Sequence, residues 1–261
     1  MKSEQIQKLV QVLISSKNTV AVTGAGISTE AGIPDFRGKD GIYTKMGGEE
    51  KVMPLINIDA FRRDPAKFYD FHWQRFNFPP VEPCKAHTIL MDMEKNNFLE
   101  GIVTQNIDGL HQKAGSKKVF AIHGNSNQYI CTGCRELHNR VYAMTYAPGT
   151  PVCSKCGSIL KPNVVLFGEN ILHYGDAAEL IMNARCLLVI GTSLTVYPLA
   201  GMVKDFSTLM QDLIIINKGP TQLDHAALLK IEMEEEDSLG AILERTFAGL
   251  MAASIARRPK I

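Results

Sequence analysis

Four cysteines in the middle of the chain have the type and the spacing of metal ligands. Cys131 and Cys134 form one Cys-x-x-Cys pair, Cys153 and Cys156 form a second, and 18 residues separate the two pairs. Each short turn directs two thiolates at one centre, and two such turns complete the tetrahedron that Zn²⁺ prefers. Because four protein ligands leave no open position on the metal, the predicted zinc site is structural.

A glycine turn near the N-terminus is a second candidate site. The β-branched run 19–23 leads into Gly24, Ala25 and Gly26, and a strand that ends in such a turn presents backbone N–H groups to a phosphate. The common dinucleotide fingerprint has its third glycine where this chain has Thr29, and no clear acidic residue closes a second strand about 20 residues later. The turn therefore predicts nucleotide binding and disfavours a hydride-transferring dehydrogenase.

Further polar residues follow other apolar runs, at the places where the predicted strands end. In an open α/β sheet the carboxyl ends of the strands border the ligand crevice, so side chains far apart in the sequence converge there. Each residue also has a simpler role as a turn former, a helix cap or a surface histidine, but four coincident clusters favour a site. The clusters are Gln105, Asn106, Ile107 and Asp108; His123; Gly191, Thr192 and Ser193; and Asn217.

The apolar runs themselves are short and mostly lack polar alternation, which is typical of parallel strands covered on both faces. Residues 4–16 predict an amphipathic helix, and helix-like stretches at 87–97 and 176–184 lie between the runs. This alternation predicts an α/β fold, a Rossmann-like doubly wound parallel sheet. The predicted strands are 19–23, 101–104, 119–122, 164–167, 186–190 and 213–217.

Two segments interrupt the alternation. Residues 36–83 are rich in aromatic, charged and proline residues and are predicted to form a cofactor loop and a helical insertion. Residues 126–160 carry the four cysteines and are predicted to form the zinc-binding module. The remaining residues, 1–35, 84–125 and 161–261, are assigned to the large nucleotide-binding domain.

The overall composition excludes several classes of protein. The chain has 261 residues, 45% of them hydrophobic and 21% charged, which is the composition of a globular protein and not of a disordered one. Its 28 basic and 27 acidic residues give a net charge of +1, so no overall field favours a nucleic acid or a membrane as partner. Charged and polar residues interrupt the N-terminal segment where a secretory signal has an apolar run, so a cytoplasmic location is expected.

Several motifs occur together in one order along the chain: residues 24–28, 32–38 and 104–111, His123 with Gly124, the four cysteines, and residues 164–169 and 191–193. In these motifs and in their order the chain resembles the sirtuin family of NAD-dependent protein deacylases. The resemblance extends from about residue 19 to residue 217, and the short flanks are similar to those of a minimal, prokaryote-type member.

The resemblance implies an NAD-dependent protein lysine deacetylase with NAD as co-substrate and a structural Zn²⁺, which transfers the acetyl group to ADP-ribose and releases nicotinamide. It implies catalytic roles for His123, as general base, and Asn106. NAD would contact Gly24, Ala25, Gly26, Ser28, Ile33, Asp35, Phe36, Arg37, Gln105, Asn106, Ile107, Asp108, Gly191, Thr192, Ser193, Asn217 and Lys218. Acetylated lysine would bind within an extended peptide strand against Val165, Phe167, Gly168, Glu169, Leu194 and Val196.

One departure from the family pattern bears on the acyl group. Family members that prefer succinyl or malonyl groups carry a tyrosine and, three residues later, an arginine that pairs with the acyl carboxylate. In this chain Tyr69 is followed at that distance by His72. Without a guanidinium the bidentate, charge-assisted contact is lost, so neutral acyl groups are expected.

Three other functions remain open. A protein ADP-ribosyltransferase would use the same NAD pocket and would add mass to its protein target, whereas a deacylase removes it. A zinc ribbon that binds nucleic acid is supported only by the four cysteines. The basic residues of 127–161 form no continuous stripe with aromatic residues between them, as a nucleic-acid-binding surface would. A dehydrogenase would change the absorbance of its nicotinamide.

Overall fold

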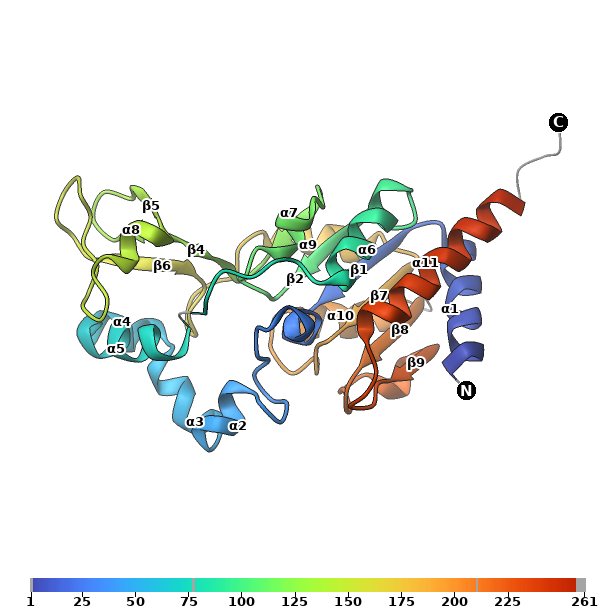
Figure 1. Cartoon of the computed structure of the whole chain (residues 1–261), viewed down its shortest axis with the longest axis horizontal. Coiled ribbons are helices and arrows are strands. Elements are labelled where there is room, and N and C mark those ends of the chain that lie inside the picture. The colour runs from blue at the N-terminus through green and yellow to red at the C-terminus, as the bar shows by residue number, and fades with distance from the viewer. Residues whose placement is uncertain (1, 77, 210, 257–261) are drawn as a thin grey trace.

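A six-stranded parallel sheet is the main feature of the computed structural model, which describes residues 2–76, 78–209 and 211–256. The strand order is β3-β2-β1-β7-β8-β9, and every neighbouring pair is parallel (Figure 1). The strands are β1 (Thr19–Thr23), β2 (Gly101–Thr104), β3 (Val119–Ala121), β7 (Cys186–Ile190), β8 (Asp212–Asn217) and β9 (Leu229–Glu232).

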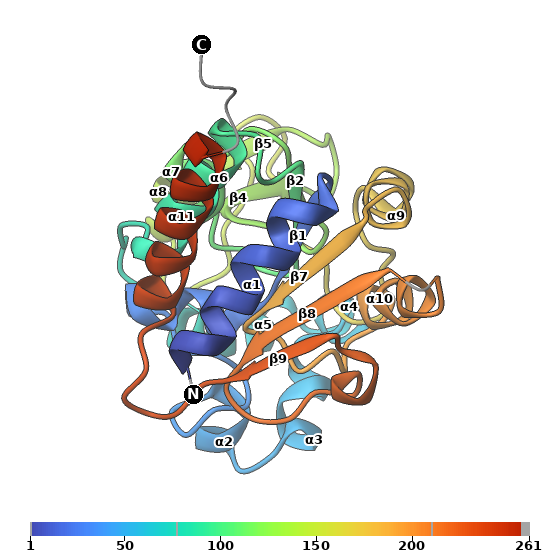
Figure 2. The ribbon, with the colours of Figure 1, turned by 90° about the vertical axis from the view of Figure 1, so that its right-hand side faces the viewer.

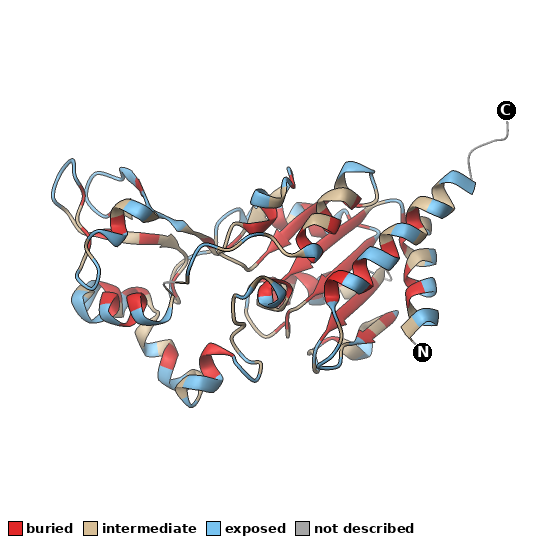
Figure 3. Cartoon of the chain, in the orientation of Figure 1, coloured by how far each residue is buried: buried red, intermediate tan, exposed pale blue. Residues whose placement is uncertain are grey.

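Helices cover both faces of this sheet, because successive side chains of each strand enter two different apolar layers. In β1, Ala21 packs with helices α1, α6 and α11, whereas Val20 and Val22 pack with α9 and α10. Figure 2 shows the sheet between these two groups of helices, and Figure 3 shows its central strands β2, β1, β7 and β8 as largely buried. The predicted doubly wound sheet is therefore confirmed. The helices are α1 (Lys2–Ser16), α6 (Lys85–Lys95), α9 (Tyr174–Met182), α10 (Leu199–Ser207) and α11 (Leu239–Ala256).

Helix α11 is the one helix in the described part of the chain with the length and the apolar composition of a membrane span. One of its faces is buried, and Ile242, Leu243 and Leu250 on that face pack in the same apolar layer as α1 and α6. Its apolar composition is thus accounted for in part by its place over the sheet, as in the core helix of a globular domain.

A three-stranded antiparallel sheet forms a small module at the other end of the molecule (Figure 1). Its central strand β4 (Gly124–Cys131) pairs with β5 (Leu137–Asn139) and β6 (Leu160–Val164), and helix α8 (Arg140–Met144) follows β5. The sheet extends beyond residues 126–160 at both ends. The predicted parallel strand over 164–167 is wrong, since Val164 ends β6 and pairs with Gly124 in the small sheet.

The helical insertion packs mainly on this small module. Its helices are α2 (Ile42–Met46), α3 (Glu49–Val52), α4 (Ile58–Arg63) and α5 (Pro65–Arg75). Phe61, Phe68 and Tyr69 share an apolar cluster with Tyr129 and Leu160 of the small sheet, and the Tyr69 hydroxyl donates to the Leu160 carbonyl at 2.5 Å. Two capped helix starts support the insertion, because the side chains of residues 57 and 64 each accept a backbone N–H from the first turn.

Candidate active site

A cleft of about 1870 Å³ lies at the carboxyl edge of the large sheet, and residues of the insertion and of the small module also line it. Most of the residues predicted from the sequence meet there. Those that line the cleft are Ala25, Gly26, Ser28, Ile33, Asp35, Phe36, Arg37, Gln105, Asn106, Ile107, Asp108, His123, Val165, Phe167, Gly168, Glu169, Gly191, Thr192, Ser193, Val196, Asn217 and Lys218.

Two of the predicted residues lie behind the wall of the cleft. The Gly24 N–H donates to the Ile190 carbonyl at 3.1 Å, and a Cβ at position 24 would lie 2.6 Å from the Cβ of Thr192. Leu194 is only 1% exposed, and its side chain packs in the apolar layer beneath α10. The Leu194 side chain therefore points into the core and is not available to a peptide in the cleft.

The turn after β1 rests directly on the turn after β7. The Gly26 N–H donates to the Gly191 carbonyl at 2.9 Å, and a Cβ at position 26 would lie 2.7 Å from the Gly191 Cα. The short 3₁₀ helix η1 (Ala25–Ala31) begins at this contact and ends at Gly32, which has φ +89°. The glycines of the turn are thus required for this packing.

Three polar side chains form a connected group in the cleft. The Ser28 hydroxyl donates to the Asp108 carboxylate at 2.7 Å, and the Asn106 side-chain amide donates to the Ser28 oxygen at 3.1 Å. The backbone N–H of Asn106 in turn donates to the Thr104 hydroxyl at 3.1 Å. Because the Asn106 NH₂ group is used inside the group, its Oδ1 remains available as an acceptor.

Two buried histidines, one of them in contact with Ser28, lie beside this group. The sequence did not identify either of them as a candidate site residue. His111 Nε2 lies 2.9 Å from the Thr23 hydroxyl, His87 Nε2 lies 3.4 Å from the Ser28 hydroxyl, and the two rings are 4.8 Å apart. Burial, together with the neighbouring His87, lowers the pKa of His111 to about 3, and burial also lowers the pKa of His87. Both imidazoles are therefore neutral at pH 7. The sequence motif 104–111 could have pointed to His111, because it ends at that residue.

His123 is held as a neutral base. Its Nδ1 lies 3.0 Å from the Gln105 carbonyl, which only accepts, so Nδ1 carries the proton and the lone pair is on Nε2. The Gln105 side chain is itself fixed, because the Thr192 hydroxyl donates to its Oε1 at 2.9 Å. Burial lowers the pKa of His123, and the hydrogen bond to Gln105 offsets part of this effect.

Helix α5 contributes an aromatic wall that sequence reasoning found only in part. Phe68, Phe71 and His72 line the cleft, at the three- and four-residue spacing that places side chains on one helix face. His72 Nε2 lies 2.9 Å from the Tyr129 hydroxyl, and burial, with a smaller effect of the nearby Arg140, lowers the pKa of His72 to about 4. Arg140 also lines this wall, where its guanidinium donates to the carbonyl of residue 78.

The segment after β6 runs along the opposite wall. The Val165 N–H donates to the His123 carbonyl at 2.8 Å. Phe167 is paired with the insertion, since its N–H donates to the Ile56 carbonyl at 3.1 Å and its carbonyl accepts the Ile58 N–H at 3.0 Å. Backbone contacts thus anchor this segment to both the insertion and the base of the small module.

The four predicted cysteine ligands converge in the small module, where their sulfur atoms lie within 4.8 Å of one another. The Cys131 and Cys156 sulfurs are 3.4 Å apart, and those of Cys134 and Cys153 are 3.7 Å apart. Zn–S bonds of about 2.3 Å in a tetrahedron place sulfurs about 3.8 Å apart, so the cluster fits a zinc ion.

The surroundings of the cluster also suit bound thiolates. The N–H groups of Cys134 and Lys155 point at the sulfurs of Cys131 and Cys153, each at 3.4 Å. His138 Nε2 lies 3.3 Å from the Cys153 sulfur. Such outer hydrogen bonds orient metal ligands and spread the negative charge of a tetrathiolate site.

The model of the Sir2 family matches residues 24–198. An NAD-dependent protein deacetylase of Clostridium perfringens is 39% identical to this chain over 245 residues, which are 92% of the chain and 97% of that protein. A structure of a Sir2 variant with a deacetylated p53 peptide and 3′-O-acetyl-ADP-ribose superposes with a TM-score of 0.83 and 35% identity, over 95% of this chain and 98% of the other. A Sir2 structure with a p53 peptide and NAD⁺ superposes with a TM-score of 0.80 and 34% identity, over 96% of this chain and 99% of the other.

The cysteine cluster predicts the effect of removing one ligand. Cys131→Ala should lower the zinc content from about one ion per chain to near zero and should lower the melting temperature, because binding of a structural zinc is coupled to folding. Metal analysis and thermal unfolding of the purified protein measure both. Cys84→Ala, which removes a thiol outside the cluster, is the control and should retain zinc. Full zinc content in Cys131→Ala would contradict the assignment.

His111 predicts a loss of stability in mild acid. Its pKa is about 6.5 when unfolded and about 3 when folded, so as the pH falls below 6.5 the unfolded chain takes up a proton that the folded chain does not. This difference should cost about 2 kcal/mol of unfolding free energy between pH 7 and pH 5. His111→Gln keeps a donor for Thr23 but cannot take up a proton. Between pH 7 and pH 5 its unfolding free energy should therefore fall by about 2 kcal/mol less than that of the parent protein, as measured by urea unfolding at the two pH values.

The exposed His225 provides the control for this measurement. His225→Gln should leave the difference in stability between pH 7 and pH 5 unchanged. If His111→Gln lost as much stability on acidification as the parent protein, His111 would not be held neutral by burial.

Proposed function

The chain belongs to the Sir2 family, and from this membership we propose how its cleft carries out NAD-dependent deacetylation of protein lysine. The resemblance drawn from the sequence is confirmed by a family model that covers more than half of the chain and by relatives that match nearly all of it. The protein is an NAD-dependent protein deacetylase that acts on acetyl-lysine. The observation that carries the assignment of roles is that His123 lines the same cleft as the glycine turn and the segment after β6.

The donor set of the cleft fits NAD. The side chains of Gln105, Asn106 and Asp108 would face the nicotinamide ribose, the turn at Gly26 would face the pyrophosphate, and Asn217 would face the adenosine half. NAD, when bound, supplies the ADP-ribosyl group that accepts the acetyl group as nicotinamide leaves. The hydrogen bonds among Ser28, Asn106 and Asp108 fix these side chains before any ligand arrives, so little reorganisation is needed on binding.

His123 is the general base of this proposal. Its Nε2 lone pair is available at neutral pH because Nδ1 is protonated and donates to Gln105. A base at this position can take a proton from a ribose hydroxyl, and such a positioned base contributes about 10²- to 10⁴-fold to the rate. The Gln105 carbonyl orients the His123 ring and also offsets part of the lowering of its pKa, whereas Thr192 contacts only the Gln105 side chain.

The acetylated peptide would lie between the segment after β6 and the loop after β7, where Val165, Gly168 and Val196 line the cleft. Backbone pairing as an added strand would supply most of the affinity with little dependence on sequence. Phe36, Phe167 and Val165 would form apolar walls around the acyl-lysine chain. This arrangement supports a range of protein substrates.

Removal of the imidazole tests the role of His123. His123→Ala should lower the steady-state rate at which an acetyl-lysine peptide is deacetylated with NAD by at least about 100-fold, with the fold and the affinity for acetyl peptide retained. His173→Ala, which removes an exposed histidine, is the matched control and should keep the parent rate. A near-normal rate in His123→Ala would remove this residue from the mechanism.

The α5 side chains that line the cleft carry no charge, and the guanidinium beside them, Arg140, donates to the carbonyl of residue 78; this arrangement predicts acyl preference. Because His72 is uncharged at pH 7 and Tyr69 is buried with its hydroxyl bound to Leu160, a succinyl carboxylate would enter without a charge-assisted partner from α5. The value of kcat/KM for a succinyl-lysine peptide should be lower than for the matched acetyl peptide by about tenfold or more. A propionyl peptide, which is larger than acetyl but neutral, controls for size. Comparable values for succinyl and acetyl would contradict this prediction.

A further inference from the structure

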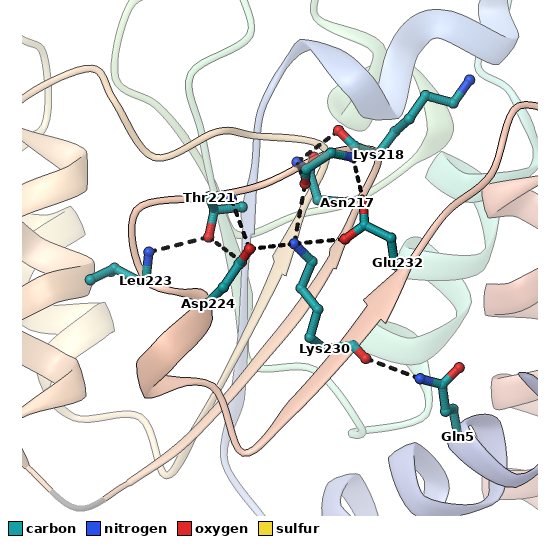
Figure 4. Close-up of polar contacts among 9 residues, drawn as sticks. Gln5, Asn217, Lys218, Thr221, Leu223, Asp224, Lys230 and Glu232 are labelled. Carbon is teal, nitrogen blue, oxygen red and sulfur yellow. Dashed lines mark hydrogen bonds and ion pairs between the residues drawn. The ribbon is translucent and has the colours of Figure 1, made fainter. Parts of the chain in front are cut away.

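A partly buried lysine holds the loop that lines one end of the cleft. The side chain of Lys230, on β9, is only 18% exposed. Its Nζ lies 2.7 Å from the Asp224 carboxylate and 2.9 Å from the Glu232 carboxylate, and it donates to the Gly219 carbonyl at 3.1 Å (Figure 4). A cation with three acceptors around it ties β9, the 3₁₀ turn η3 (Asp224–Ala226) and the loop after β8 together.

Gly219 is held from both sides of the loop. Its N–H donates to Glu232 Oε1 at 2.6 Å, and its carbonyl accepts from Lys230 and from the Asn217 side chain. With φ +80°, the residue has a backbone conformation that favours glycine. The loop is part of the cleft, because Asn217, Gly219 and Pro220 all line it.

These contacts determine which atom Asn217 offers to a ligand. Its Nδ2 donates to the carbonyls of Lys218 at 3.1 Å and of Gly219 at 3.0 Å. Carbonyls only accept, so the NH₂ group must be the one that faces the loop. Asn217 Oδ1 is therefore left as the acceptor on the cleft side.

The charges of the cluster depend on Lys230. Burial opposes ionisation of Asp224, but hydrogen bonds from Lys230 and Thr221 outweigh this and hold the pKa of its carboxyl below the usual value. Glu232 lies on the other side of the same ammonium group. Without that cation, two carboxylates would face each other beside the loop, and Gly219 would lose one of the donors to its carbonyl.

We propose that Lys230 is a positioning residue for the adenosine half of NAD. By holding Gly219 it fixes the Asn217 amide so that Oδ1 accepts a hydrogen bond from an adenosine ribose hydroxyl. Lys230 does not touch the ligand and acts through Gly219 and Asn217. The inference rests on the placement of NAD given under the proposed function.

Calorimetric titration of NAD and of ADP-ribose into purified variants tests this role. Lys230→Met should raise the Kd of both ligands by about tenfold. Both ligands contain the adenosine half, and the variant loses the charge-assisted hydrogen bond from Lys230 to Gly219 that holds Asn217 in place. In steady-state assays the KM for NAD should rise, while kcat and the KM for acetyl peptide should stay near the parent values. Lys118→Met, which breaks an exposed ion pair with Glu100, is the control and should leave both Kd values unchanged.

A second pair of variants decides the question if Lys230→Met fails to fold. Glu232 is half exposed, so its replacement does not threaten the core. Glu232→Ala removes the acceptor of the Gly219 N–H and should raise the Kd of both NAD and ADP-ribose. Glu232→Gln keeps an acceptor oxygen and should retain most of the parent affinity for both ligands.

Three results would overturn the inference: parent-like Kd values in folded Lys230→Met, no effect of Glu232→Ala, or a loss of affinity for NAD alone with ADP-ribose unaffected. A parent protein that binds neither NAD nor ADP-ribose would instead overturn the proposed function. The two failures are thereby distinguished.

Discussion

Two strand ends approach each other with no side chain between them, and the cleft depends on this contact. The turn at Gly26 and the turn at Gly191 meet backbone to backbone, and a Cβ at either position would lie 2.7 Å or 2.5 Å from the opposite main chain. The contact lies between β1 and β7, where the sheet order changes direction. A doubly wound sheet opens its ligand crevice at such a point, because the connections leave it toward opposite sides. The glycines allow the two turns to close the floor of that crevice.

The groups around this floor show one electrostatic principle. The buried His87 and His111 and the half-buried His123 all have a lowered pKa, and each has at least one ring nitrogen within hydrogen-bond distance of a partner that suits a neutral ring. Lys230, a largely buried cation, is found between two carboxylates. These imidazoles and this lysine can therefore be oriented at low cost, since none of them is an unpaired buried charge.

The sequence was informative where one local pattern had one physical solution. Two Cys-x-x-Cys turns can share a tetrahedral ion, and short apolar runs between helices can be buried in a parallel sheet. It was not sufficient where an outcome depended on partners far away in the chain. The run 164–167 looked like another parallel strand, but Val164 pairs with Gly124 of the small sheet. Lys230 gave no signal, because its short strand contains charged residues and two of its three acceptors, Asp224 and Gly219, lie outside that strand.

The connection between the two sheets explains why the zinc module can matter to chemistry outside it. His123 lies between the end of β3, in the large sheet, and the start of β4, in the small one. The chain returns beside it, since β6 ends at Val164 and the next N–H donates to the His123 carbonyl. At Gly124 the start of β4 and the end of β6 pack so closely that a Cβ would lie 2.2 Å from a backbone oxygen of β6. The proposed base and the proposed peptide segment thus form the junction itself, and the cysteine cluster, at the far end of β4, stabilises the strand on which that junction depends.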